Sequence, residues 1–314
     1  MRKYILKRIL LMLLLLIGMS FIVFASLYIA PGDPATMVAG PSATEEDIAV
    51  VRASLGLDKP FFVQYLMYLR RLVTLDLGIS YTSRQPILQE ILVRLPHTLN
   101  LACAAMIISV FLGVPAGILT ALHKDSAVDN TLTTSSLILL SIPNFLLGVM
   151  LMYFFAVRHK WLPVGGMEHF FWTKEGFREA LLPAFALATG TMASFIRLGR
   201  SAMLDVMQTD YIRTARSKGL MRRTIIYIHA FRNALIPLIT QFGTSFGGLL
   251  GGAIITEQVF VINDIGTYLI NAIRNYNYPV VQSTVIVIAA MFIIINLLVD
   301  ILYCVIDPRI KLEG

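Results

Sequence analysis

The sequence predicts an all-α membrane protein with six transmembrane helices, and composition and apolar patterning together support this fold class. Of its 314 residues, 57% are hydrophobic and only 14% are charged, whereas soluble domains carry about 25% charged residues. One polytopic membrane unit therefore fits better than two soluble domains. Six apolar stretches reach the roughly 20 residues that a spanning helix needs: 9–30, 99–122, 132–157, 181–204, 234–258 and 281–306.

The first of these stretches is expected to be an uncleaved helix. It follows the basic start MRKYILKR, as a signal peptide would. However, a signal peptide has an apolar region of about 7–15 residues and a small-residue cleavage site. The stretch 9–30 is longer, and no clear A-x-A site follows it.

Three later stretches carry residues that disturb a simple span. Arg197 and Arg200 lie in the last two turns of the fourth span, so those turns are expected to emerge into the cytoplasm or to line the protein interior. Pro115 and Pro143 are expected to kink the second and third spans, because proline lacks the backbone N–H that a helix interior uses.

The distribution of lysine and arginine predicts that both chain ends face the cytoplasm. Four basic residues precede the first span, and the last turns of span four together with the connection to span five carry eight basic residues against Asp205 and Asp210. Short loops rich in Lys and Arg stay on the cytoplasmic side. Six spans then return the C-terminus, with Arg309 and Lys311, to the same side. This bias accounts for most of the net charge of +7, so membrane lipid and not nucleic acid is the expected environment.

The chain is expected to divide into a first helix over 1–30, an external region over 31–96, a five-helix core over 97–306 and a cytoplasmic tail over 307–314. In the external region, Thr44 to Asp47 resembles a capping box and predicts a short helix to about Ser54. A second, amphipathic helix is predicted from Phe61 to Thr74. Its apolar face could meet the membrane surface, an external partner or this chain's own bundle. Asp264-Ile265-Gly266 predicts a further short helix before the last span.

The fifth span has a face of small residues with overlapping G-x-x-x-G spacings, which let helix backbones approach closely. Contact with a second membrane subunit and packing within this chain both remain open. The glycines are Gly243, Gly247, Gly248, Gly251 and Gly252.

The familiar catalytic patterns point away from an enzyme. Gly243 to Gly247 formally matches the G-x-S-x-G nucleophile motif, but that motif needs a strand-to-helix turn and here lies in a predicted span. The five histidines show no metal-ligand spacing, and the two cysteines lie in predicted spans, where they are expected to pack. The sequence contains no Gly-Lys pair, so it has no P-loop. Any ATP is therefore expected on another chain, and no metal or cofactor is expected on this one.

Four polar residues are candidates for lining a transport pathway, because polar groups inside spans are functional candidates by default. Asn144 follows Pro143, and Glu257 lies at the outer end of the fifth span. Asn296 and Asp300 share one face of the last span, but Asp300 lies about two turns from the cytoplasmic end, which favours an interhelical or interfacial structural role for it. These residues do not form the chain of carboxylates that a proton-driven carrier uses.

The segment of about 205–237 is polar and basic, yet it connects two apolar spans. It predicts a helix over 205–218, a sharp turn at Gly219 with positive φ, and a second helix over 220–233 that runs into the fifth span. Because the segment is joined to both spans, a cytoplasmic partner that moved it would also move the spans.

Two parts of this segment, YIRTARSKGL (211–220) and HAFRNALIP (229–237), resemble the EAA loop of permease subunits in dipeptide, oligopeptide and nickel ABC importers. The general pattern has Glu-Ala-Ala and a later Gly, where this chain has Arg213-Thr214-Ala215 and Gly219. That departure is typical of this subfamily. Further matches along the chain are APGDP (30–34), LGLDKP (55–60), DLGIS (76–80), YPVVQ (278–282) and DPR (307–309).

The resemblance implies a type I ABC importer permease in a bacterial cytoplasmic (inner) membrane. The implied partners are a second homologous permease subunit, one or two cytoplasmic ATPase subunits that bind ATP and Mg²⁺, and an extracytoplasmic substrate-binding protein. The residues implied to contact the ATPase are Asp210, Tyr211, Arg213, Thr214, Ala215, Arg216, Lys218, Gly219 and Leu220.

Peptides are the expected cargo, since the resemblance is to a subfamily that carries dipeptides and oligopeptides. Nickel or another chelated metal, and glutathione-like peptides, remain alternatives, because specificity would reside largely in the binding protein. A secondary carrier that works without ATP is the alternative from a different class.

Overall fold

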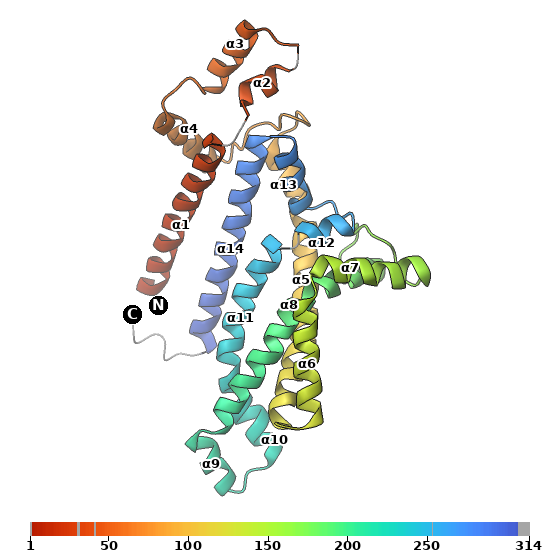
Figure 1. The fold of residues 1–314 in the computed structure, drawn as a ribbon. Helices are drawn as coiled ribbons and strands as arrows, with labels where there is room; N and C mark the ends of the chain where they lie inside the picture. The colour runs from red at the N-terminus through yellow and green to blue at the C-terminus, as the bar shows by residue number, and fades with distance from the viewer. Residues whose placement is uncertain (1, 30–31, 41, 253, 307–314) are drawn as a thin grey trace. The chain divides into compact units, whose positions relative to one another are not determined.

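The computed structural model describes residues 2–29, 32–40, 42–252 and 254–306, and these are helical almost throughout (Figure 1). The chain forms two compact units. We call residues 99–262 with 294–306 the core unit, and residues 2–98 with 263–293 the flanking unit. Two long helices, α5 (Ile87–Leu122) and α14 (Tyr278–Ile306), contribute one part to each unit.

Within the described residues, five helices are long and apolar enough to cross a membrane, and a bent pair supplies a sixth span if it is counted as one. The five are Arg8–Ile29, Ile87–Leu122, Lys174–Met207, Arg222–Gly251 and Tyr278–Ile301. The predicted all-helical membrane fold is therefore confirmed.

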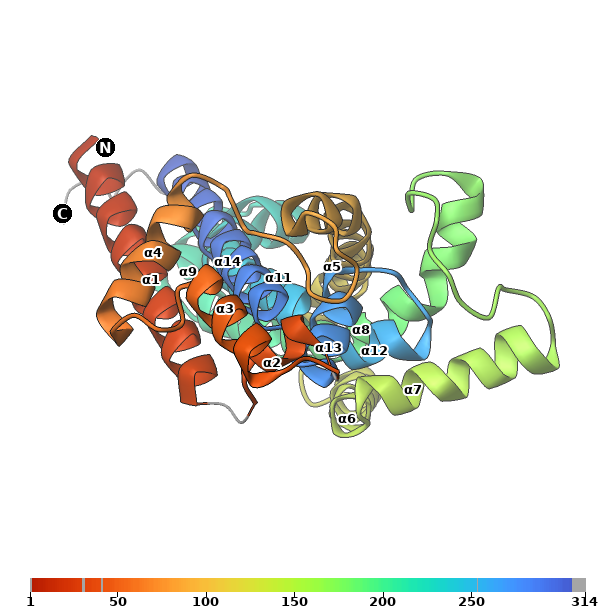
Figure 2. The same cartoon turned by 90° about the horizontal axis from the view of Figure 1, so that it is seen from above.

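The third span departs from the expected kinked helix over 132–157. Helix α6 (Ala127–Ser141) and the helical pair α7 (Asn144–Leu151) and η1 (Met152–Arg158) meet at 99°. Figure 2 shows α6 nearly end-on, with α7 projecting sideways from it. Pro143 causes the break, because proline disfavours helical backbone in the preceding residue. Ile142 is accordingly extended, with φ −87° and ψ 123°.

Helix α5 starts earlier than the sequence indicated, at Ile87 and not at residue 99. Its first turns contain Gln89, Glu90 and Arg94, which lower the average hydropathy there. The backbone N–H of Ile87 donates to the carbonyl of Gly78 at 3.0 Å, which fixes the start of the helix. The helix then continues through Pro115 without interruption.

In the flanking unit, α4 (Phe61–Val73) packs against α1 (Arg2–Ile29) through aromatic side chains. The ring of Phe24 contacts Tyr65 and Tyr68 at centroid distances of 5.5 and 5.7 Å. The hydroxyl groups of Tyr65 and Ser20 lie 3.0 Å apart. Of the three roles left open for the amphipathic helix, contact with its own chain is the one that the structure shows.

The cap of α3 (Glu45–Leu55) has the predicted geometry. The Thr44 N–H donates to the Asp47 carboxylate at 3.0 Å, and the Asp47 N–H donates to the Thr44 hydroxyl at 3.3 Å. Hydrogen bonds from Thr44 lower the pKa of Asp47. The predicted short helix before the last span is also confirmed: it is α13 (Ile265–Arg274), and its N-cap Asp264 accepts from the Thr267 N–H at 2.9 Å.

A buried amide orders the loops of the flanking unit. Asn277 is 2% exposed, and its Nδ2 donates to the hydroxyls of Ser80 at 2.9 Å and Thr82 at 3.2 Å. The Tyr81 N–H donates to Asn277 Oδ1 at 3.3 Å. One side chain thereby fastens the turn after Gly78 to the segment between α13 and α14.

In the core unit, α8 (Lys174–Met207) is buried at many positions along its length. Small residues let neighbouring helices approach its backbone closely. A Cβ placed on Gly117 of α5 would lie 2.6 Å from the carbonyl oxygen of Ile196. Ser109 of α5 also donates to the carbonyl of Ala188 at 3.1 Å. The remaining core elements are α9 (Asp210–Ser217), α10 (Arg222–Thr224), η2 (Ile225–Ala230), α11 (Phe231–Gly252) and α12 (Ile254–Val259).

Candidate functional site

The segment between α8 and α11 contains a short independent helix, α9. The expected continuous helix over 205–218 is wrong, because α8 ends at Met207 and α9 begins at Asp210. Thr209 is extended, with φ −71° and ψ 152°. Its hydroxyl and its N–H both donate to the carbonyl of Val206, at 2.6 and 3.1 Å. Threonine can satisfy a helix-end carbonyl in this way, so α9 leaves α8 in a new direction.

The turn after α9 is the one that the sequence predicts. Gly219 has φ +75°, a conformation that costs residues with a Cβ roughly 1–2 kcal/mol. Its N–H donates to the Arg216 carbonyl at 2.9 Å, and the Leu220 N–H donates to the Ala215 carbonyl at 3.4 Å. Glycine in this position commonly ends a helix.

The second helix of the segment starts slightly later than expected. Leu220 and Met221 are not helical, and Met221 is extended, with φ −59° and ψ 140°. From Arg222 the chain continues through α10 and η2 into α11. The π-helical turn η2 is of the kind that often occurs at functional sites.

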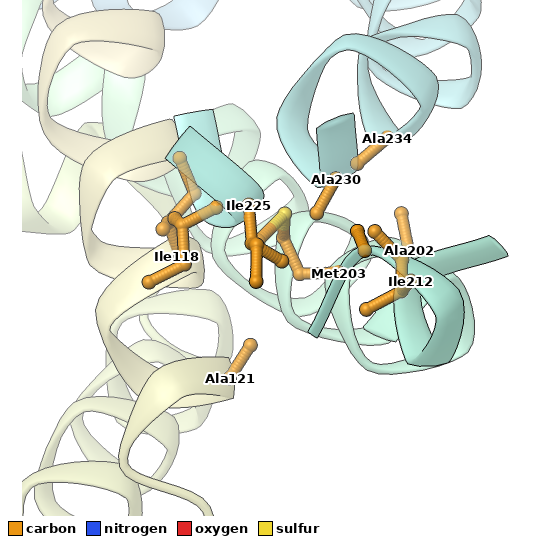
Figure 3. Packing of buried hydrophobic residues seen from close by; sticks show 10 residues of the cluster. Ile118, Ala121, Ala202, Met203, Ile212, Ile225, Ala230 and Ala234 are labelled. Atoms are coloured by element: carbon orange, nitrogen blue, oxygen red, sulfur yellow. The ribbon is translucent and has the colours of Figure 1, made fainter. Parts of the chain in front are cut away.

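One face of α9 is anchored in a hydrophobic cluster. Ile212 is fully buried and Ala215 is 8% exposed. Burial of an isoleucine contributes roughly 1.5–3 kcal/mol, so this anchor holds α9 firmly. The labelled side chains, which come from α5, α8, α9, η2 and α11, lie together there (Figure 3). The cluster comprises Ile118, Ala121, Ala202, Met203, Ile212, Ala215, Ile225, Ile226, Ala230 and Ala234.

The opposite face of α9 is exposed and polar. Eight of the nine residues implied to contact the ATPase are exposed, and Ala215 alone packs inward. Neither Ile212 nor Asn233 was among the residues implied to contact the ATPase. Asn233 on α11 donates to the Tyr211 hydroxyl at 2.9 Å, which joins the two arms of the segment. An apolar residue three positions before Ala215 was the available signal for Ile212.

The four pathway candidates lie on three different helices of the core unit. Asn144 is half-buried at the start of α7, where its Oδ1 accepts from the Thr189 hydroxyl at 3.4 Å. Glu257 is 1% exposed in α12. Asn296 and Asp300 are half-buried on α14.

The glycine face of the fifth span divides into two parts. A Cβ on Gly243 would approach Val299 of α14 within 2.9 Å, so this part packs within the chain. No described atom lies within 4 Å of a Cβ placed on Gly248 or Gly251. The G-x-S-x-G match lies inside α11, where Gln241 donates to the Ser245 hydroxyl at 2.8 Å. It is a helical segment and not a nucleophile turn, as expected.

The fold resembles that of a chain from an ABC transporter of known structure. A chain from a solved structure of the MetNI methionine ABC transporter, in an inward-facing conformation, aligns with a TM-score of 0.60 at 17% identity. The alignment covers 71% of this chain and 99% of that chain.

The chain belongs to the family described as the inner membrane component of binding-protein-dependent transport systems, which it matches over residues 113–312. Residues 1–102 match the N-terminal model of the same membrane components. It is 40% identical to the dipeptide transport system permease protein DppB of Alkalihalophilus pseudofirmus, over 99% of this chain and 100% of that protein. It is 36% identical to the oligopeptide transport system permease protein AppB of Bacillus subtilis, over 99% and 100% of the two chains.

Proposed function

We propose that this permease subunit imports dipeptides and other short peptides in an ATP-driven, binding-protein-dependent transporter. The relatives named for dipeptide and oligopeptide transport align with the chain over its whole length, and this similarity supports peptides over nickel or another chelated metal. The family supports ATPase and binding-protein partners in general. The proposed assembly has a second homologous permease subunit, one or two ATPase subunits and an extracytoplasmic binding protein. This chain holds no cofactor, and its partners bind ATP and Mg²⁺.

The observation that carries the mechanism is the two-sided character of α9. Its inner face is fixed by Ile212, its outer face presents Arg213 and Arg216 to the surroundings, and exposed Lys218 follows at its C-cap. When a groove on the ATPase binds this outer face, movement of the ATPase displaces α9. The buried contacts of α9 then pass the displacement to α8 and α11. ATP thereby biases the permease between two arrangements, as a ligand does when it binds one state more tightly than the other.

The complete transporter, purified from native membranes and placed in liposomes, tests this function. We expect a second permease and an ATPase to co-purify in fixed ratio, and uptake of labelled dialanine to require both ATP inside and the binding protein outside. Unlabelled dipeptide should compete with this uptake, and Ni²⁺ should not. Uptake by the isolated chain without ATP would instead establish a secondary carrier.

A charge reversal at Arg216 should weaken the contact with the ATPase. Arg216 is exposed in the last turn of α9, and interface charges fix partner choice and register. We expect Arg216→Glu to weaken ATPase association about tenfold, the change that ~1.4 kcal/mol produces. Pull-down of the ATPase at graded concentrations measures it.

Arg274→Glu is the matched control, because Arg274 is likewise an exposed arginine in the last turn of a helix, α13. It should leave ATPase association unchanged. Equal effects of the two reversals would show that α9 is not the docking element.

A further inference from the structure

An ion pair between a buried carboxylate and a half-buried guanidinium joins α6 to α8 in the core unit. Arg200 donates through Nε and Nη2 to the two carboxylate oxygens of Asp129, both at 2.7 Å. The Asp129 side chain is 4% exposed and that of Arg200 is 28% exposed. This two-point geometry fixes the orientation of both side chains, as bidentate arginine–carboxylate pairs do. The sequence drew attention to Arg200 but did not identify its partner.

Asp129 also orders the turn that leads from α5 into α6. Its Oδ2 accepts from the Asp125 N–H at 3.0 Å, and its Oδ1 accepts from the Thr133 hydroxyl at 3.3 Å. Ser126 caps the same helix by accepting from the Asp129 N–H at 3.4 Å. One carboxylate therefore links three parts of the core unit: the α5–α6 turn, the first turns of α6, and the end of α8 that carries Arg200.

The pair lies next to the cluster that anchors α9. Met203, one turn after Arg200 on α8, is fully buried in that cluster together with Ile212 of α9. The backbones of α5 and α8 also meet here, since a Cβ on Gly117 would lie 3.2 Å from the backbone nitrogen of Arg200. A displacement of α9 thus reaches Arg200 through close-packed atoms, and interiors of this density transmit strain.

The far end of α6 leads into α7. It ends at the 99° bend before α7, where the hydrogen bond of 3.4 Å from Thr189 to Asn144 joins α8 to the start of α7. A neutral hydrogen bond contributes roughly 0.5–1.5 kcal/mol, and one to a charged group roughly 1.5–3 kcal/mol. The side-chain link between α6 and α8 beside α9 is therefore stronger than the side-chain link between α7 and α8 at the bend.

We propose that Asp129 and Arg200 are positioning residues that fasten α6 to α8, so that movement of α9 is delivered to α6 and to the bend at Pro143. The proposal rests on the proposed contact between α9 and the ATPase. A buried ion pair is weak support for overall stability, because the cost of desolvation offsets the attraction. Its bidentate geometry instead sets which helices move together.

The experiment uses the complete transporter with Asp129→Asn, Arg200→Lys and, as a matched control, Asp125→Asn. Asp125 is an exposed carboxylate on the same turn with φ +62°, a conformation that asparagine also tolerates. Two quantities are measured: dipeptide transported per ATP hydrolysed, and the distance between spin labels at Thr131→Cys on α6 and Ser217→Cys on α9. Both label positions are exposed, and Cys103 and Cys304 are replaced by alanine.

We expect Asp129→Asn to lower transport per ATP at least about fivefold, the lower end of typical coupling between sites. The label distance should be narrow and unchanged by ATP in the parent chain and in Asp125→Asn, and broad in Asp129→Asn. Arg200→Lys keeps the positive charge but loses the two-point guanidinium contact. It should therefore lower transport per ATP and broaden the label distance less than Asp129→Asn does. If Asp129→Asn fails to fold, Arg200→Lys tests the proposal alone.

An unchanged label distance or unchanged transport per ATP in both Asp129→Asn and Arg200→Lys would overturn the proposal. A parallel loss of thermal stability and of ATP hydrolysis, with transport per ATP preserved, would assign the pair a purely structural role and would also overturn it. If the parent transporter showed no ATP-dependent uptake, the proposed function would be wrong. The label distance without nucleotide would still decide whether the pair fastens α6 to α9.

Discussion

Replacement of Gly219 by proline is expected to abolish ATP-dependent transport while the chain still inserts into the membrane. Gly219 has φ +75°, whereas the proline ring fixes φ near −65°. The substitution also removes the N–H that donates to the Arg216 carbonyl at 2.9 Å. These two effects together cost ~3 kcal/mol or more, so the turn between α9 and Arg222 cannot form as it does in the parent chain.

The consequence is local because the turn is exposed and lies outside the apolar spans. Without it, the two arms of the segment no longer bring Tyr211 to Asn233, which lie in hydrogen-bond contact at 2.9 Å. The outer face of α9 then presents the wrong geometry to the ATPase. Membrane fractionation measures insertion, and uptake of labelled dialanine by the complete transporter measures transport.

Two milder substitutions separate backbone conformation from side-chain size. No described atom lies within 4 Å of a Cβ at Gly219, so Gly219→Ala meets only the conformational cost of roughly 1–2 kcal/mol. Asparagine tolerates positive φ better than alanine does. Transport should therefore fall in the order Gly219→Asn, Gly219→Ala, Gly219→Pro. Full transport by Gly219→Pro would refute the role of this turn.

Features set by local sequence were predicted well. The capping box at Thr44, the helix after Pro60, the N-cap at Asp264 and the turn at Gly219 all have the expected form. In each case the signal consists of residues within one or two turns of the site where it acts. Hydropathy likewise located the spans, because the membrane requires a fixed length of apolar helix.

Features set by contacts distant in sequence were not predicted. Asp129 and Arg200 are separated by 71 positions, and Asn277 and Ser80 by 197. Nothing near Asp129 indicates its partner. Tertiary contacts also set the direction that the chain takes at a helix break. Pro143 predicts that the helix is disturbed, but the 99° bend depends on how α7 packs against α8 and α12.

Gly117→Ala is expected to destabilise the core unit strongly, although alanine is the better helix former. In a helix interior, alanine is favoured over glycine by ~1 kcal/mol. Here a Cβ would lie 2.6 Å from the Ile196 carbonyl oxygen and 3.2 Å from the Gly199 Cα. These neighbours are backbone atoms of α8, so relief requires the two helices to separate. Overpacking of this kind typically costs about 1–3 kcal/mol.

Gly199 and Gly248 provide matched controls for this substitution. A Cβ on Gly199, at the same crossing, would meet Gly117 at 3.6 Å, and no described atom lies within 4 Å of a Cβ on Gly248. Thermal unfolding of the purified chain in detergent should therefore show a lower Tm for Gly117→Ala, a small change for Gly199→Ala and an unchanged or higher Tm for Gly248→Ala. If Gly117→Ala matched Gly248→Ala, α5 and α8 would not be in backbone contact there. The proposed transmission of movement from α9 to Arg200 uses the same backbone contact between α5 and α8. That outcome would therefore remove the close-packed route at this crossing.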